Sequence, residues 1–105
     1  MISKTKVKLK DTSKLCELID FYMHSDSFKK LSGAAQIDYE SCLFIVRDAL
    51  GHVKLTNITG TLAQDAYNIW LSRGIYRANK IASVLSIVLN KGIKMDLKIV
   101  NPMPL

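Results

Sequence analysis

The chain segment 76–91 carries the clearest apolar pattern in the sequence. Its apolar positions recur at i, i+3, i+4 and i+7, which is the period of a half-buried helix. They are Ala78, Ile81, Val84, Leu85, Val88, Leu89 and Gly92. The opposite side has basic and hydrogen-bonding groups and no acid, namely Tyr76, Lys80, Ser83, Asn90, Lys91 and Lys94. We expect a helix that packs on a core with one side and is able to bind a polyanion with the other.

Two earlier segments show the same helical period. The first is predicted over 13–24, after the good N-cap residues of the Asp11-Thr12-Ser13 cluster. The second is predicted over 33–50, with Ser32 as its N-cap and Gly51 as a left-handed residue that ends it. The second helix is expected to bury Tyr39, Cys42, Leu43, Val46, Ala49 and Leu50.

A third segment, 62–73, lies directly before the helix described first. Thr61 and Gln64 have the spacing of a capping box at its start. Its expected buried face comprises Leu62, Ala66, Ile69 and Trp70, and Gly74 ends the helix. The segments between the helices, 25–31 and 52–59, are predicted to be connectors. No helix-length segment alternates with period two, so the prediction is an all-α fold without a sheet.

Length and composition fit a single helical domain. The 105 residues are 49% hydrophobic and 23% charged, which is typical of a globular chain with one modest core. The apolar run Leu43-Phe44-Ile45-Val46 is far shorter than the ~20 residues of a membrane span. The first ten residues lack the apolar segment of a secretory signal. We therefore expect a cytoplasmic protein with no membrane partner, in which Cys16 and Cys42 are free thiols.

The positive charge is concentrated at the two ends of the chain. The net charge is +6, residues 1–10 contain four lysines and no acid, and residues 71–105 have Asp96 as their only acid. The central part, 11–70, contains more acidic than basic side chains. This asymmetry is typical of a nucleic-acid footprint, although basic ends could also simply keep a small domain in solution.

The sequence offers no recognisable catalytic or metal-binding set. His24 and His52 are far apart on connectors, and no CxxC, HExxH or Gly-rich phosphate loop occurs. Asp38 and Glu40 are two residues apart and point to different helix faces, so they do not form an acid/base pair. We expect no enzymatic activity, no metal and no cofactor. Trp70 and Tyr67 are interpreted as core residues in preference to a base-stacking platform.

The candidate site is the polar side of the last helix and the residues leading into it. Free N–H groups at a helix start favour phosphate, and guanidinium and ammonium groups bind phosphate oxygens. Asn79 could read an adenine edge in a major groove, or it could be an ordinary surface amide. Lys29 and Lys30 could hold a second stretch of backbone. The candidate DNA-binding residues are Lys29, Lys30, Ser32, Gln36, Arg73, Tyr76, Arg77, Asn79, Lys80, Ser83 and Lys91.

Several short motifs occur one after another along the chain. They are Phe21-Tyr22 ending the first helix, Tyr39 early in the second, Gly51, Leu55 with Ile58-Thr59, the run Gly74-Ile75-Tyr76-Arg77-Ala78-Asn79-Lys80, the pairs Val84-Leu85 and Val88-Leu89, and finally Asn101-Pro102. In order and spacing they resemble the core-binding domain of phage-type integrases, which are tyrosine recombinases. The resemblance covers most of 12–102. It departs from the family at Arg77, where threonine is common, and at Ala82, where a large apolar residue is common.

The resemblance implies a four-helix, SAM-like orthogonal bundle with helices at about 13–24, 33–50, 62–73 and 76–95. The last helix would therefore continue past Gly92. The implied organisation is a basic arm at 1–11, a DNA-binding domain at 12–100 and the start of a linker at 101–105. The implied function is to clamp double-stranded DNA while a separate C-terminal catalytic domain of the same parent chain cuts and rejoins strands. Such a domain would be a monomer alone, and its phage-encoded or bacterial parent would be oligomeric on DNA.

A second hypothesis belongs to a different functional class. Ile37, Phe44 and Ile87 fall outside the apolar stripes of their helices. They could bind a protein, which would make the domain a helical adaptor with no DNA role. They could equally be buried by a small change in helix tilt, or meet the catalytic domain.

Overall fold

The described part of the chain contains five α-helices. The computed structural model describes residues 9–10, 12–97 and 99–102. The helices are α1 (Leu15–Met23), α2 (Asp26–Lys29), α3 (Gly33–Leu50), α4 (Gly60–Trp70) and α5 (Ile75–Lys94), with short 3-10 turns η2 (Leu55–Asn57) and η3 (Leu71–Arg73). Within these residues the only β-type pairing is an isolated bridge between Lys14 and Lys54. The predicted all-α class is confirmed.

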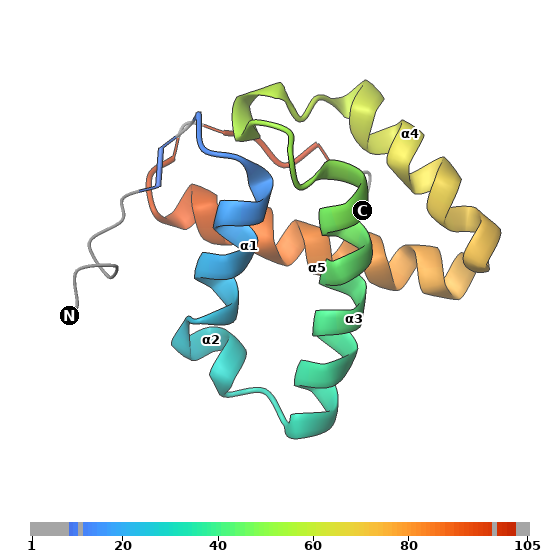
Figure 1. Ribbon diagram of the computed structural model, residues 1–105, viewed down its shortest axis with the longest axis horizontal. Helices are drawn as coiled ribbons and strands as arrows, with labels where there is room; N and C mark the ends of the chain where they lie inside the picture. The colour runs from blue at the N-terminus through green and yellow to red at the C-terminus, as the bar shows by residue number, and fades with distance from the viewer. Residues whose placement is uncertain (1–8, 11, 98, 103–105) are drawn as a thin grey trace.

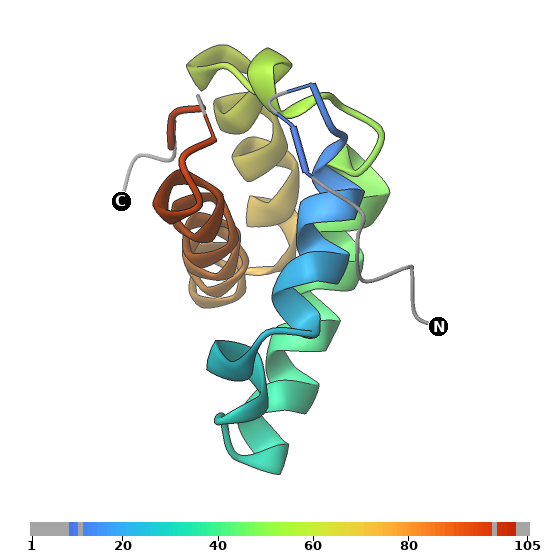
Figure 2. The same cartoon turned by 90° about the vertical axis from the view of Figure 1, so that its left-hand side faces the viewer.

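Helix α5 is the element on which the others pack. It runs across the molecule behind α1 and α3, while α4 approaches its first turn through η3 (Figure 1). It contacts α1, α3, α4 and η3, and its contacts with α3 are the most extensive. The α2–α3 junction projects away from α5 in both views (Figures 1 and 2). None of the helices in the described part of the chain is long and apolar enough to cross a bilayer.

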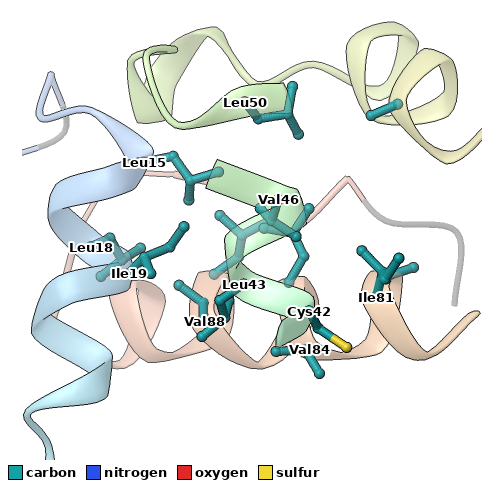
Figure 3. Close-up of a cluster of buried hydrophobic side chains, with 14 of the residues drawn as sticks. Leu15, Leu18, Ile19, Cys42, Leu43, Val46, Leu50, Ile81, Val84 and Val88 are labelled. Atoms are coloured by element: carbon teal, nitrogen blue, oxygen red, sulfur yellow. The ribbon is translucent and has the colours of Figure 1, made fainter. Parts of the chain in front are cut away.

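The core lies where α1 and α3 cross α5. Leu15, Leu18 and Ile19 of α1 point toward Leu43 and Val46 of α3 and the apolar side of α5 (Figure 3). Every member of the predicted α5 stripe is buried, namely Ala78, Ile81, Val84, Leu85, Val88, Leu89 and Gly92. Truncation of one such leucine to alanine typically costs about 2–5 kcal/mol, so this crossing sets the stability of the domain.

The start of α1 differs from the prediction. A cap was expected in the cluster at 11–13, of which Asp11 lies outside the described residues, but the N-cap position is Lys14. The link between α3 and η2 supplies acceptors for the first amides of α1. The Leu15 amide donates to the Val53 carbonyl at 2.9 Å, and the Cys16 amide donates to the Gly51 carbonyl at 3.0 Å. Backbone carbonyls from a distant segment therefore satisfy two free amides of the first turn, and Glu17 Oε2 accepts from the Lys14 amide at 3.2 Å.

Helix α3 has the predicted bounds, and one end agrees with the expected cap. Ser32 Oγ accepts a hydrogen bond from the Ala35 amide at 3.1 Å, so the N-cap is confirmed. The left-handed conformation predicted for Gly51 is wrong, because its φ of −58° and ψ of −30° are right-handed. A Cβ there would lie 2.5 Å from the Arg47 carbonyl oxygen, so this position favours glycine because of close approach.

Helix α4 begins earlier than predicted, and Ile69 is the only residue of its predicted buried face that is exposed. Its N-cap is Thr59, whose Oγ1 accepts from the Leu62 amide at 3.2 Å, and the predicted capping box of Thr61 and Gln64 is wrong. Ala63, Ala66 and Trp70 are buried, whereas Ile69 is 68% exposed. Two alanines on the inner face let α4 approach closely, and this orientation leaves Ile69 in solvent.

The two ends of α5 agree with the prediction. Gly74 precedes it with φ 101° and ψ 149°, a conformation that side chains rarely adopt. The helix continues through Gly92, and the chain then reverses at Asp96, whose φ is 68°. Asn101, where the linker was expected to begin, returns to α5: its Nδ2 donates to Ser86 Oγ and to Asn90 Oδ1, each at 3.2 Å.

The predicted connectors contain two short helical elements. Helix α2 lies within 25–31, and its Phe28 is buried with its ring centroid 5.6 Å from that of Tyr22. Turn η2 lies within 52–59 and buries Leu55. Leu9, part of the predicted arm, packs against the core, while arm residues 1–8 and tail residues 103–105 lie outside the described residues.

Candidate nucleic-acid interface

The cations of α5 form a row along one side of the helix. We call Arg77, Lys80, Lys91 and Lys94 the α5 cation row. By helical geometry Lys80 and Lys91 lie within about 20° of each other around the axis and about 16 Å apart along it. Ile87, 38% exposed, lies between them. Because α5 itself contains no acid, any carboxylate that pairs with the row comes from outside this helix.

Asp38 of α3 supplies that charge at one end of the row. Its Oδ1 lies 3.3 Å from Arg77 Nη1, and its Oδ2 lies 3.3 Å from Lys80 Nζ. One carboxylate therefore faces two cations with both oxygens. The Arg77 side chain is 33% exposed, and the side chains of Asp38 and Lys80 are 42% exposed, so solvent screens these pairs.

Two neutral groups of α3 contact the same cations. Arg77 Nη2 donates to Ser41 Oγ at 2.7 Å. Lys80 Nζ lies 5.0 Å from the centroid of the Tyr39 ring, within the range of a cation–π contact. We call Asp38, Tyr39, Ser41, Arg77 and Lys80 the Asp38 cluster. It fixes both cations near the surface where α3 crosses the start of α5.

Asn79 lies on the other side of this helix start and has a partner on α4. The Tyr67 hydroxyl donates to Asn79 Oδ1 at 2.6 Å. The bidentate contact with adenine needs both the oxygen and the nitrogen of an amide. Since the oxygen already accepts from Tyr67, the geometry leaves the Nδ2 donors as the groups most available to a ligand.

Arg73 and Tyr76 flank the glycine before α5 and extend into solvent. Tyr76 is 89% exposed. Large apolar side chains lie near them in sequence, with Ile69 at 68% and Ile75 at 58% exposure. Exposed apolar side chains and the exposed Arg73 therefore lie close together in sequence around the start of α5.

The predicted residues near α3 are separate from the start of α5. Lys29 and Lys30 are exposed at the projecting α2–α3 junction (Figure 1). Ser32 caps α3, and Gln36 Nε2 donates to the carbonyls of Lys29 at 3.2 Å and Leu31 at 2.9 Å. The hydrogen bonds within the protein therefore explain why polar residues stand at positions 32 and 36, without a role in DNA binding.

Lys91 and Lys94 border a shallow hollow between α5 and the α1–α2 corner. Tyr22, Ser27, Ile87 and Asn90 complete its lining. Among the residues described, no carboxylate pairs with Lys91 or Lys94 in the way that Asp38 pairs with Lys80. The far end of the α5 cation row therefore has no carboxylate partner among the described residues.

The structure brings together only part of the predicted set. Arg73, Tyr76, Arg77, Asn79 and Lys80 gather at the start of α5, with half-buried Ser83 one turn further along. Lys91 lies at the other end of the helix, and the α2–α3 group lies at a third place. Sequence reasoning missed Asp38, Tyr39 and Ser41, whose contacts join segments about forty residues apart. No local spacing in the chain signals such a contact.

The other titratable groups that the structure describes form no second site. Burial raises the pKa of the Cys42 thiol, and the nearby Arg77 charge lowers it by less. Both cysteines are free, with Cys42 buried and Cys16 half-buried. Within the described ranges, no three His, Cys, Asp or Glu side chains gather in the manner of metal ligands.

The chain was compared with family models, curated proteins and solved structures. No protein-family model, curated protein or solved structure matches this chain.

Proposed function

We propose that this chain is a double-stranded DNA-binding domain of the core-binding type found in phage-type integrases. Two observations support the proposal: the ordered motifs between Phe21 and Pro102, and a 20-residue helix whose exposed side has cations and no acid. The α5 cation row is the observation that carries it. We further propose that the five helices form the SAM-like orthogonal bundle of that family, with α2 as an addition in the first connector.

The α5 cation row has a length suited to duplex DNA. Lys80 and Lys91 are about 16 Å apart along the axis, and the major groove of B-DNA is about 12 Å wide. The two ends of α5 could therefore contact phosphates on opposite sides of one groove. Arg73 and the Nδ2 group of Asn79 would add donors at the first end. Such contacts position a protein on DNA without reading its sequence.

Binding to a duplex measured at several salt concentrations tests this proposal. Each neutralised phosphate adds roughly 0.9 to the slope of log affinity against log salt. The double variant Arg77→Ala/Lys80→Ala should weaken binding to every sequence and reduce that slope. The matched control Arg47→Ala/Lys54→Ala removes the same charge outside α5 and should have a smaller effect. Undetectable duplex binding by the unchanged protein at low salt would refute the proposed function.

Catalysis belongs, in this proposal, to a separate domain. The domain proposed here has no enzymatic activity and acts beside a C-terminal catalytic domain of the same parent chain. It would be a monomer alone, while the parent would be oligomeric on DNA in the bacterial cytoplasm. A relaxed, nicked or religated product from incubation of this chain with plasmid DNA would contradict the assignment.

A helical adaptor is the second candidate, and exposed apolar side chains favour it. Ile37 and Phe44 are 69% and 72% exposed, although both stand on α3, which is otherwise packed in the core. An NMR titration separates the two functions. Shifts at 73–83 on addition of duplex DNA favour the first, whereas shifts at Ile37 and Phe44 on addition of a protein partner favour the adaptor.

A further inference from the structure

The contacts of Asp38 bear on how DNA would reach the start of α5. We propose that Asp38 is an intramolecular competitor of DNA phosphate for Arg77 and Lys80, and that its release accompanies binding. This inference rests on the proposed DNA-binding function and adds a regulation of that site. Its basis is that one carboxylate on α3 occupies, with both oxygens, two cations of the row at 3.3 Å each.

The geometry of these pairs makes them easy to open. Charge-assisted hydrogen bonds are usually about 2.7–2.9 Å long, and both contacts are longer. All three side chains are one-third or more exposed, so water replaces the lost contacts at little cost. A DNA phosphate group is an anion that could bind the same two cations in place of the Asp38 carboxylate. The neighbouring phosphates of the duplex add to its attraction for them.

The neutral members of the Asp38 cluster would keep the cations in place after release. Ser41 Oγ accepts from Arg77 at 2.7 Å, and the Tyr39 ring contacts Lys80. Neither contact carries negative charge, and neither uses the Asp38 oxygens. Arg77 and Lys80 therefore each retain a partner on α3 when Asp38 turns away. These contacts would hold both side chains in position while a DNA phosphate replaces the Asp38 carboxylate.

The test compares two variants that change net charge equally. Asp38→Asn removes the competing charge and keeps the side-chain shape. Asp48→Asn is the matched control, because Asp48 is exposed on the same helix and no ion pair with it occurs in the described residues. At 50 mM salt Asp38→Asn should bind a duplex about three- to tenfold more tightly than the unchanged protein, and Asp48→Asn less than about twofold.

Two results of this affinity comparison would overturn the inference. Weaker binding by Asp38→Asn would show that Asp38 positions Arg77 and Lys80 for DNA, and equal gains in both variants would show a general effect of net charge. A second measurement needs no variant. The carboxyl carbon resonance of Asp38 should shift when duplex is added to the unchanged protein, and a constant resonance during saturable binding also overturns the inference. Absence of binding by the unchanged protein would instead refute the proposed function itself.

Discussion

The hydroxyl of Tyr67 donates a 2.6 Å hydrogen bond to Oδ1 of Asn79, which ties α4 to the first turn of α5. Asn79 was the one candidate for direct base readout. The bond fixes the orientation of its amide and uses one of the two lone pairs of the oxygen that adenine recognition requires. The amide remains able to donate to a phosphate or to a base acceptor, so the structure changes which role it suits.

Asn79→Ala should therefore weaken duplex binding by a similar factor for all sequences. The lost group is a donor to the backbone in this interpretation, and loss of one hydrogen bond costs about 0.5–1.5 kcal/mol. Affinities for a panel of duplexes that differ in A·T content measure this. Asn68→Ala, at an exposed position of α4, is the matched control and should leave affinity unchanged. A loss confined to duplexes with one particular adenine would restore the base-readout role.

Ser32→Ala should lower stability without changing DNA affinity. It removes the Oγ that accepts from the Ala35 amide, and loss of such a cap typically costs about 1 kcal/mol. In a domain of this size that shifts the melting temperature by roughly 4–8 °C. Ser32→Asn keeps a capping oxygen and should stay close to the unchanged protein. If Ser32→Ala melts normally but binds DNA poorly at 15 °C, Ser32 contacts DNA after all.

Gly74→Ala should destabilise the fold by about 1–3 kcal/mol. The position has φ 101° and ψ 149°, which strains any residue with a Cβ even though nothing lies within 4 Å of one. Gly60→Ala is the control, because a Cβ there also meets nothing within 4 Å and no left-handed φ applies. Denaturant unfolding of the two variants separates backbone strain from a general effect of alanine. Equal stability of both variants would mean that the turn before α5 relaxes freely.

Much of this fold could be predicted because its determinants are local. The α5 stripe, the Ser32 cap and the break at Gly74 each depend on residues within one or two turns. Two of the errors arise where distant segments decide the outcome. Carbonyls of the α3–η2 link replace the expected side-chain cap of α1. The tilt of α4 on α5 leaves Ile69 exposed, and no pattern within α4 fixes that tilt.

Stability should decrease as pH rises above the ordinary thiol pKa of 9.0, partly because of Cys42. Burial raises the pKa of this thiol in the folded state, so between the two pKa values the unfolded state binds fewer protons. The stabilising effect is complete below the unfolded pKa and decreases above it. Cys42→Ala, though less stable overall, should show a flatter decrease between pH 8 and pH 10 in urea unfolding. If the free energy of unfolding decreased equally with pH in both proteins, the Cys42 thiol would not contribute to that decrease.

The candidate site was less predictable than the fold. Helical spacing predicted a polar side with Lys80, Lys91 and Lys94, and these three residues do share the helix α5. Helical spacing could not reveal the ion pair between Asp38 and Arg77. The two residues are thirty-nine positions apart in the chain, and they meet only because α3 crosses α5. The role of Gln36 was also hidden, because its amide closes a turn whose shape is set by α2.

Trp70 provides this domain with an internal spectroscopic reporter. It is the only tryptophan of the chain and is 2% exposed on the inner face of α4. Its fluorescence emission should therefore be blue-shifted when α4 is docked and red-shifted when that helix separates from the core. Because the indole lies away from solvent, quenching by added iodide would reveal opening of α4 in solution before any complete unfolding.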